Sequence, residues 1–458
     1  QAMQTIDFFD PALLNKYNIN GPRYTSYPTA LEFNNDVSDA TLLTAAQTSP
    51  AQDLSLYVHI PFCHSLCYYC GCNKVVTRHA DKADRYLDYL SKEITLRAAA
   101  FGHYTVRQLH LGGGSPSFLS AEQHQRLMAL LKDAFNFADD AQCSIEIDPR
   151  TVDTDYISAL ANAGYRRISI GVQDTDYNVQ QAINRVQSTS HIAILVEHAR
   201  QVGFESVNLD LIYGLPHQTE ETFKTTLAAV KAMEPERVSL FSYAHLPERF
   251  AAQRKIKNEW LPSAELKLAL MKQAMATLSE VGYELIGMDH FAKADDELAV
   301  AQRQGELHRN FQGYTTRGDL DLLGLGVSSI SAVHNMYGQN PKTLNEYYAA
   351  LDTPANLTSK GVLLNRDDML RRQVIMQLMC NLNLAIRDIE SEWEIDFTAY
   401  FADAIAALDP FIDDGLVSVT AQHIRVAPKA RLLIRIISMS FDAYLAKQVH
   451  QRRYSRVI

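Results

Sequence analysis

The chain has 458 residues, enough for a large α/β domain with one or two smaller pieces. Apolar residues make up 47% and charged residues 21%, which is ordinary for a soluble globular protein. The formal charge of −10 argues against a general nucleic-acid binder, which needs a basic surface, although a local basic pocket for an anion is still compatible with it.

The N-terminal stretch QAMQTIDFFDPALL carries early acidic residues and no long apolar run, so it is not typical of a secretory signal. No stretch has the length of an uncharged transmembrane helix. We therefore expect a cytoplasmic protein without membrane contact, in which thiols stay reduced. Residues 1–50 are expected to form an N-terminal arm and lead-in that includes GPRYTSYPTALEF, a segment with proline and tyrosine but little periodicity.

Residues 51–360 are expected to form a parallel barrel. Short, nearly continuous apolar runs alternate there with amphipathic helical segments, the pattern of βα units. Six units fall short of the eight of a full barrel, so we predict a partial (β/α)6 open barrel with a wide mouth. The predicted strands are LSLYVHI, VRQLHLG, CSIEID, RISIGV, SVNLDLIY and RVSLFSY, and the clearest helices are 81–101, 120–135 with a capping box from Ser120 to Gln123, and 220–233.

The later segments are expected to be less regular. A helix over 263–282 leads to a further edge strand at 283–292, and the Gly-, Ser- and Thr-rich stretch 307–331 is predicted to be a loop packed on the barrel. Residues 361–458 are expected to form a small, mostly helical domain resembling a winged helix, with a β-hairpin at 415–428 and a closing helix at 430–448. Given the acidity of the chain, an accessory packing or lid domain is the favoured interpretation over DNA binding.

Four of the six cysteines lie within ten residues, directly after the first predicted strand. Cys63, Cys67 and Cys70 have the spacing Cys-x3-Cys-x2-Cys. A loop leaving a strand can wrap three thiolates around a [4Fe–4S] cluster, and three protein ligands leave one iron open to a small molecule. Cys72 is too close to Cys70 to reach another iron without strain, so we expect it to be a thiol beside the cluster or the substrate. The alternative is structural zinc, which usually takes paired Cys-x2-Cys units far apart in sequence, and no second pair exists here.

Polar and glycine residues follow the other predicted strands, where such folds place their chemistry. The GGGSP motif at 112–116 lets the backbone approach a ligand, and its free N–H and C=O groups could bind one. Tyr243 ends the sixth strand, and His59 precedes the cysteines, where it could orient the loop or act chemically. Further candidates at strand ends are Glu146, Gln173, Arg185, Asp210 and Ala244, for each of which the alternative is a strand-end hydrogen bond or a helix cap.

These motifs resemble the radical S-adenosylmethionine superfamily. Within it, YVHIPFCHSLCYYCGCNK, GPRYTSYPTALEF, GGGSPS, LDLIYGLP and HRNFQGY are similar to the oxygen-independent coproporphyrinogen III oxidase family, and the similarity covers most of the chain. Related haem chaperones typically have Phe at the position of Cys72 and lack the arm ending in YPTA, so both features favour the oxidase family. Ser115 stands where Thr is commoner, and a hydroxyl is retained.

The resemblance implies a [4Fe–4S] cluster on the three spaced cysteines and S-adenosylmethionine as cofactor. It implies that the cofactor contacts Tyr57, Tyr69, Cys72, Gly113, Gly114, Ser115, Glu146, Gln173, Arg185, Asp210, Ala244 and Ile330. Coproporphyrinogen III carries four carboxylates, so the arm residues Arg23, Tyr24 and Tyr27 are candidates to bind it and to close over the site, excluding water. Phe311 and Gln312 have the same candidate role, and the alternative for these residues is a segment that merely packs on the surface.

The resemblance further implies oxidative decarboxylation of two propionates to vinyl groups, giving protoporphyrinogen IX in haem biosynthesis by means of a 5′-deoxyadenosyl radical. An external one-electron reductant and an electron acceptor are needed, and neither can be identified from the sequence. We expect a monomer, since no heptads or apolar patch are evident. The rival interpretations are a haem-binding chaperone of the same superfamily, a radical enzyme acting on RNA, which should carry a basic domain, and a protein with a purely structural cluster.

Overall fold

The computed structural model describes residues 10–445 except 20, 73 and 354–355. The N-terminal stretch up to Phe9 and the predicted end of the closing helix at 446–448 lie outside these residues. The chain divides into two compact units. The larger comprises Phe33–Lys267 and Asp319–Leu363, and the smaller comprises the described parts of Gln1–Glu32, Leu268–Gly318 and Leu364–Ile458. Both units are discontinuous in sequence, and the domain boundaries at 50 and 360 stay predictions.

The larger unit is built on a sheet in the order β16-β15-β14-β13-β1-β4-β5-β6-β7-β8. From β13 to β8, each strand runs parallel to the next one in this order. This confirms the partial, open barrel of six βα units. Its six strands are β1 (Asp53–Ile60), β4 (Thr105–Gly113), β5 (Asn136–Ile147), β6 (Arg167–Gln173), β7 (Ser206–Tyr213) and β8 (Arg237–Ser242).

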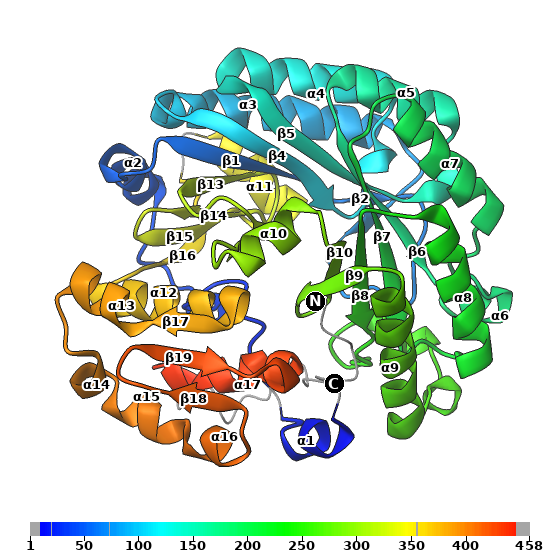
Figure 1. The fold of residues 1–458 in the computed structure, drawn as a ribbon. Helices are drawn as coiled ribbons and strands as arrows, with labels where there is room; N and C mark the ends of the chain where they lie inside the picture. The colour runs from blue at the N-terminus through cyan, green and yellow to red at the C-terminus, as the bar shows by residue number, and fades with distance from the viewer. Residues whose placement is uncertain (1–9, 20, 73, 354–355, 446–458) are drawn as a thin grey trace. The chain divides into compact units, whose positions relative to one another are not determined.

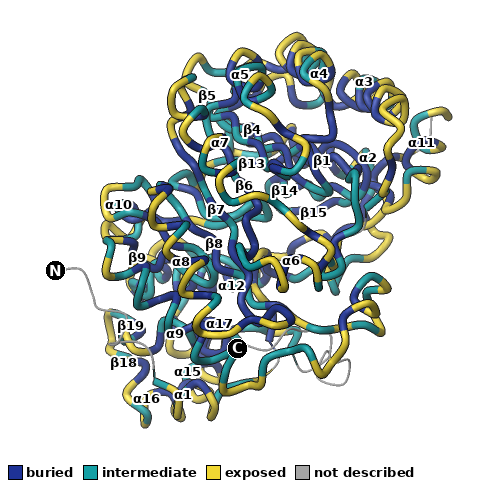
Figure 2. The backbone as a smooth tube through the Cα atoms, turned by 90° about the vertical axis from the view of Figure 1, so that its right-hand side faces the viewer, coloured by how far each residue is buried: buried dark blue, intermediate teal, exposed yellow. Residues whose placement is uncertain are grey.

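The strands are buried because helices cover the sheet. Leu54, Leu56, Val58 and Ile60 of β1 are all fully buried, as expected of a strand in a parallel sheet. Figure 1 shows the helices following the strands along the outer face, and Figure 2 shows their exposed outer turns. These helices are α3 (Asp81–Phe101), α4 (Ala121–Ala134), α5 (Thr154–Ala163), α7 (Thr189–Gln201) and α8 (Glu220–Met233), with α6 (Tyr177–Ala182) inserted after β6.

The helix starts agree with their capping residues. The Ser120 side chain accepts from the Gln123 N–H and the Gln123 side chain accepts from the Ser120 N–H, which is the predicted capping box of α4. Thr219 caps α8 in the same way, with Thr222 as its partner. Helix α9 (Ala264–Glu280) also follows the prediction.

The stretch 307–331 is not a loop, contrary to the prediction. It contains the hairpin β11 (His308–Asn310) and β12 (Gly313–Thr315), then β13 (Leu320–Leu325) and β14 (Ile330–Val333). Strand β13 pairs parallel to β1 and so continues the barrel sheet. A Cβ at Gly324 would come within 2.5 Å of the Ile330 carbonyl oxygen, so this glycine serves a close approach within the sheet rather than a flexible loop.

Strand β14 continues into β15 (Met336–Gln339) and β16 (Lys360–Leu363), all antiparallel, with α11 (Leu344–Asp352) between the last two. Helix α2 (Asp39–Thr48) also belongs to the larger unit. Asp39 at the start of α2 links this helix to α3 and to the segment before β16. Its carboxylate lies 2.9 Å from the buried Arg97 guanidinium on α3 and accepts from the Thr358 N–H at 2.9 Å.

The smaller unit contains helix α1 (Pro11–Lys16), the hairpin β9 (Tyr283–Gly287) and β10 (His290–Lys293), helix α10 (Glu297–Arg303), and the C-terminal region. The predicted single edge strand at 283–292 is therefore two antiparallel strands. The C-terminal region has helices α12 (Arg366–Asn381), α13 (Ile386–Trp393), α14 (Phe397–Tyr400), α15 (Ala402–Ala407) and α16 (Asp409–Asp413) and a small sheet in the order β17-β19-β18.

The predicted hairpin at 415–428 is confirmed as β18 (Val417–Val419) and β19 (His423–Val426), joined by β17 (Asn383–Ala385). The predicted closing helix is wrong over its described part, 430–445, where only α17 (Ile434–Ser438) is α-helical and 3-10 turns flank it. All residues of α17 are buried, so packing from every side decides this segment rather than an amphipathic period. In the described part of the chain, no helix is both long and apolar enough to cross a membrane.

Candidate active site

The cysteine loop begins where β1 ends. Cys63 lies in the short strand β2 (Phe62–Cys63), which pairs in parallel with β3 (Val75–Val76) and closes the base of the loop. Cys67 is buried, Cys63 and Cys70 are half-buried, and Cys72 is exposed. All are free thiols. Three thiols thus project from one short loop at the carboxyl end of the first barrel strand.

The thiols of this loop differ in their electrostatics. Burial raises the pKa of Cys63 to about 12. The pKa of Cys70 falls to about 5, chiefly because the Cys72 thiol donates a hydrogen bond to its sulfur. The backbone N–H of Cys72 donates to the same sulfur at 3.4 Å. The hydrogen bonds from Cys72 therefore favour the thiolate form of Cys70, the form that binds iron, and Cys72 has a defined contact beside it.

The donor set fits an iron–sulfur cluster. In the described residues, no three His, Cys, Asp or Glu side chains converge closely enough to hold a single metal ion. The three thiolates of a cubane cluster each bind a different iron, so they need not converge on one point. Among the described residues, Cys63, Cys67 and Cys70 would hold such a cluster.

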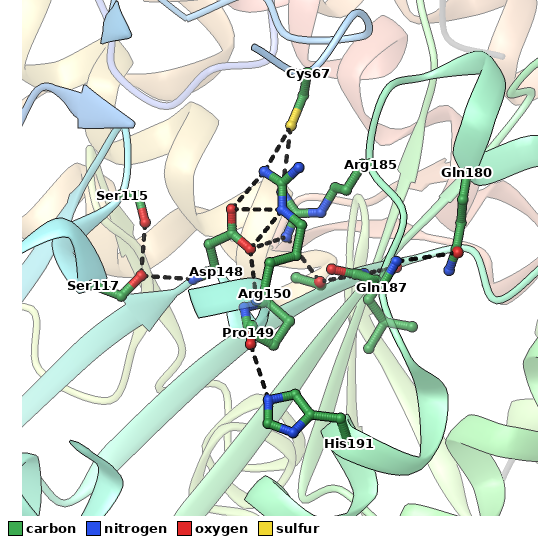
Figure 3. A network of polar contacts seen from close by, with 12 residues as sticks. Cys67, Ser115, Ser117, Asp148, Pro149, Arg150, Gln180, Arg185, Gln187 and His191 are labelled. Carbon is green, nitrogen blue, oxygen red and sulfur yellow. Dashed lines mark hydrogen bonds and ion pairs between the residues drawn. The ribbon is translucent and has the colours of Figure 1, made fainter. Parts of the chain in front are cut away.

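A buried charge network surrounds Cys67 (Figure 3). Arg150 Nη2 donates to the Cys67 sulfur at 3.4 Å and Arg185 Nη1 donates to it at 3.8 Å. The Asp148 carboxylate binds Arg150 through Nε at 3.0 and 3.1 Å and through Nη2 at 2.6 Å, and lies 3.7 Å from Arg185 Nη2. Burial raises the pKa of Asp148, but the two guanidinium groups outweigh it and lower that pKa to about 2. The network joins the ends of β5 and β6 to the cysteine loop.

The GGGSP motif packs against the start of the cysteine loop. The N–H of Gly114 donates to the Ile60 carbonyl at 2.7 Å, and the N–H of Ser115 donates to the Phe62 carbonyl at 2.8 Å. These two N–H groups are thus used within the protein, and the role of the motif's backbone groups toward a ligand stays a prediction. A Cβ at Gly114 would lie 2.8 Å from the backbone of Pro61, and Gly113 has φ +119°, so glycine is required at both positions.

Tyr57, His59 and Glu146 lie near one another on the inner strands. The Tyr57 hydroxyl and His59 Nδ1 are joined by a 3.0 Å hydrogen bond. A Cβ at Gly112 would meet Glu146 Oε2 at 2.9 Å and the Tyr57 hydroxyl at 3.2 Å. Burial lowers the pKa of His59 to about 4, which keeps the imidazole neutral, and its buried Nε2 has no hydrogen-bond partner in the structure. The structure thus brings two predicted cofactor contacts together with a histidine whose second nitrogen is available.

His110 extends this cluster. Its ring stacks on Tyr57 with centroids 6.1 Å apart, and its Nε2 lies 3.4 Å from Glu146 Oε1. Its Nδ1 is joined to the Ser144 hydroxyl at 2.6 Å. His110 therefore lies between Tyr57, Ser144 and the Glu146 carboxylate.

Gln173 and Arg185 flank β6 where it ends. A Cβ at Gly171 would meet Arg185 Nη2 at 2.6 Å and Gln173 Nε2 at 2.8 Å. Gln173 is the last residue of β6 and has φ +64°. Its buried Oε1 has no hydrogen-bond partner in the structure, which is the arrangement expected of an acceptor for a bound amino or hydroxyl group. Arg185 Nη1 also donates to the Tyr69 hydroxyl at 3.1 Å and its Nη2 to the Gly171 carbonyl at 2.9 Å.

Asp210 lies within β7 rather than at its end, contrary to the prediction. Burial and the charge of Glu146 raise its pKa to about 7, although Asn208 donates to its carboxylate at 2.9 Å.

Ala244 and the buried Tyr243 follow β8 directly. Ile330 begins β14, and its backbone lies against Gly324, which is paired in register with Tyr57.

The predicted substrate contacts lie in the smaller unit. Tyr24 and Tyr27 are almost completely buried there, with Tyr24 donating to Asp442 at 2.8 Å and Tyr27 accepting from the Ala443 N–H at 3.0 Å. Arg23 is paired with Asp289. Phe311 and Gln312 are half-buried in the turn between β11 and β12. Their role at the substrate stays a prediction.

Sequence reasoning missed Asp148, Arg150 and His110. Asp148 and Arg150 stand in the DPR triplet directly after the third strand, a position that marks candidates in this fold. His110 stands two positions before the glycine motif in LHLGGG, and a histidine between two leucines near the end of a predicted strand was a usable signal.

The fold and the site together indicate the class of protein to which the chain belongs. A model of the Radical SAM superfamily matches residues 57–230, which include the cysteine loop and the strand ends described above. A model of the HemN C-terminal domain matches residues 364–433. Proteins of the radical SAM superfamily use a [4Fe–4S] cluster and S-adenosylmethionine, and these are accordingly the cofactors of this chain.

Comparisons along the whole chain identify the family within this superfamily. The oxygen-independent coproporphyrinogen III oxidases of Salmonella typhimurium and Escherichia coli K12 are 53% and 52% identical to the chain, over 99% and 100% of both proteins. That of Helicobacter pylori is 42% identical over 97% of the chain and 98% of the relative. A solved structure of Escherichia coli coproporphyrinogen III oxidase (HemN), described as a radical SAM enzyme, matches with a TM-score of 0.92 over 95% of this chain and 99% of that chain. The chain belongs to the oxygen-independent coproporphyrinogen III oxidase family.

Proposed function

We propose that this protein decarboxylates two propionate side chains of coproporphyrinogen III to vinyl groups and so forms protoporphyrinogen IX. The observation that carries the proposal is the identity of 52–53% along essentially the whole chain with proteins named for this activity. The haem-chaperone alternative has no comparable support among these relatives.

Cys63, Cys67 and Cys70 would hold the cluster, and the remaining iron would be free for S-adenosylmethionine. When bound, the two cofactors supply the one-electron chemistry that removes a hydrogen from the substrate. The unpartnered Gln173 Oε1 and the carboxylates of Glu146 and Asp210 would accept hydrogen bonds from S-adenosylmethionine. The remaining contacts to S-adenosylmethionine are proposed for Tyr57, Tyr69, Cys72, Gly113, Gly114, Ser115, Arg185, Ala244 and Ile330.

The chain's own residues prepare the site. Arg150 and Arg185 donate to the Cys67 sulfur, and Asp148 keeps both guanidinium groups in place. Neutral His59 is held by Tyr57, with Nε2 available as a hydrogen-bond partner. The substrate's carboxylates call for cationic partners, for which Arg23 is proposed, with Tyr24, Tyr27, Phe311 and Gln312 contributing contacts.

The reaction needs a one-electron reductant and a final electron acceptor. We place the protein in the cytoplasm, where its free thiols stay reduced, and propose that it acts as a monomer.

Anaerobic incubation of cluster-loaded protein with dithionite, S-adenosylmethionine and coproporphyrinogen III tests the proposal. We expect 5′-deoxyadenosine and a divinyl product from the wild type and neither from Cys67→Ser. The Cys143→Ser variant is the matched control, because Cys143 is a buried thiol of β5 outside the cysteine loop, and it should retain both products. Stoichiometric haem binding by a wild-type protein that forms no vinyl product would reject the proposal in favour of a chaperone.

A further inference from the structure

A basic segment follows β8 at residues 249–257. Its sequence RFAAQRKIK contains four cationic residues and no acidic residue, in a chain whose net charge is −10. The side chains of Arg249, Arg254, Lys255 and Lys257 are all exposed. Such a local concentration of one sign of charge on an oppositely charged protein is typical of a surface that attracts a charged partner.

The basic segment packs directly on the cysteine loop. Gln253 is buried, and its Nε2 donates to the Tyr69 carbonyl at 3.1 Å. A Cβ at Gly71 would lie 3.1 Å from the Phe250 ring. Ile256 belongs to the same apolar cluster as Tyr68 and Tyr69. The inner side of the segment therefore touches the loop that would hold the cluster, while its cations face water.

The cations of the segment make contacts within the described part of the protein but no ion pairs. Among the described residues, none of the four forms an ion pair with a carboxylate. Arg254 Nε donates to the Pro247 carbonyl at 3.1 Å, and Lys257 lies over the Trp260 ring at 5.3 Å. The acidic Glu248 and Glu259 stand just outside the segment, and the four cations outnumber them. Next to the segment, the large apolar side chain of Leu246 is 38% exposed, and Gly71 and Cys72 of the loop are exposed too. Apolar contact bordered by charge is the composition expected of a transient protein interface.

We propose that the basic segment is the docking surface for an acidic one-electron carrier protein that reduces the cluster. The inference rests on the proposed function, because only a redox reaction needs such a carrier. The carrier gives up one electron and the cluster takes it up, with no bond made or broken. Since the net charge of −10 would repel an acidic carrier, a basic surface touching the cysteine loop directs the carrier to the place where its electron is used. Encounters of this kind need only a small contact area.

The test uses an acidic flavodoxin as the carrier and the cluster-loaded protein. Lys255→Glu with Lys257→Glu reverses two charges of the segment. Lys224→Glu with Lys231→Glu is the matched control, which makes the same change in net charge at two exposed positions of α8. Calorimetric titration at low and high salt gives the dissociation constant of flavodoxin, and turnover is measured with flavodoxin and, separately, with dithionite.

We expect the segment variant to bind flavodoxin about tenfold more weakly at low salt and to lose most of the salt dependence, while the control stays within about twofold of the wild type. Dithionite-driven turnover should be the same in all proteins. Lys255→Gln with Lys257→Gln should give an intermediate affinity, which separates loss of attraction from misfolding.

Equal flavodoxin affinity in the segment variant and the control would overturn the inference. So would a raised KM for coproporphyrinogen III under dithionite, because the segment would then attract the substrate's carboxylates instead. Failure of the proposed function is distinguishable, since wild-type protein would then form no vinyl product with dithionite whatever its affinity for flavodoxin.

Discussion

Replacing Asp148 by Asn should destabilise the protein more than any other conservative change near the cysteine loop. The Asp148 carboxylate is mostly buried, with 19% of its side chain exposed, and it accepts from Arg150 and pairs with Arg185. Asn keeps the shape but removes the charge and turns an N–H₂ group toward guanidinium donors. Two buried guanidinium groups are then left without a counter-charge.

The magnitude follows from the pKa of this group. A drop from 3.8 to about 2 corresponds to a contribution of about 2.5 kcal/mol to the free energy of unfolding at neutral pH. Removing one partner of a buried pair costs roughly 3–5 kcal/mol in general. We therefore expect Asp148→Asn to lower the free energy of unfolding by about 3 kcal/mol. Because the folded pKa lies below the unfolded one, this contribution is present above about pH 4 and is lost as the pH falls toward 2.

Urea unfolding followed by circular dichroism under anaerobic conditions measures the effect. The matched control is Asp153→Asn at the exposed N-cap of α5, where Asp153 accepts from the Tyr156 N–H at 2.8 Å. Asn caps a helix about as well as Asp, so the control should change the free energy of unfolding by less than about 0.5 kcal/mol. If Asp148→Asn costs no more than this control, or costs the same at pH 3 as at pH 7, the buried charge network does not stabilise the fold as argued.

Three further changes probe the charge network, the glycine motif and Asp174, a buried carboxylate directly after Gln173. Arg150→Met removes an N–H donor to the Cys67 sulfur and should shift the cluster's midpoint potential negative by about 60 mV, the equivalent of about 1.4 kcal/mol, in an EPR-monitored redox titration; an unchanged potential would count against this hydrogen bond. Gly114→Ala places a Cβ 2.8 Å from the backbone of Pro61 and should lower the free energy of unfolding by about 1–3 kcal/mol. It should also abolish the binding of S-adenosylmethionine measured by calorimetry. Unchanged binding would mean that the backbone shifts to accept the Cβ without disturbing the site. Gln218→Leu removes the 2.8 Å hydrogen bond that the Gln218 amide donates to Asp174, whose pKa is raised by burial to about 6. Losing this donor raises the pKa of Asp174 further and disfavours its ionised form, so the free energy of unfolding should fall by about 1–3 kcal/mol, and by more at pH 8 than at pH 5. A loss of stability independent of pH would show that Gln218 does not stabilise the ionised carboxylate.

The barrel could be predicted from the sequence because its strands are short, apolar and evenly interleaved with amphipathic helices. Helices α3 and α8 begin and end at the predicted residues, and the capping box at Ser120 is present. These features are local, so neighbouring residues specify them without knowledge of the rest of the chain.

The errors occurred where contacts distant in sequence decide the structure. The glycines at 318–326 suggested a loop, yet Gly324 lies in a strand, where the close approach of the Ile330 backbone leaves no room for a side chain. The segment at 430–448 has a helical composition, but in its described part, up to residue 445, packing on all sides leaves only a short α-helix at 434–438. Periodicity carries no information about such partners.

The candidate site could be predicted only in part, because some of its features are local in the sequence and others join distant residues. The thiol spacing of Cys63, Cys67 and Cys70 is a local pattern that points to a cluster. Asp148 and Arg150 follow β5, whereas Arg185 follows α6, and only the structure shows that these two segments meet at the Cys67 sulfur.

The central claim is that three cysteines hold the cluster and leave one iron to S-adenosylmethionine. EPR spectroscopy of the anaerobically reduced protein, with and without S-adenosylmethionine, tests it most directly. The claim predicts a [4Fe–4S] signal that changes on addition of the cofactor and is lost in Cys67→Ser but kept in Cys72→Ser. A spectrum indifferent to S-adenosylmethionine, a cluster that needs Cys72 as its fourth ligand, or zinc in the loop would contradict it.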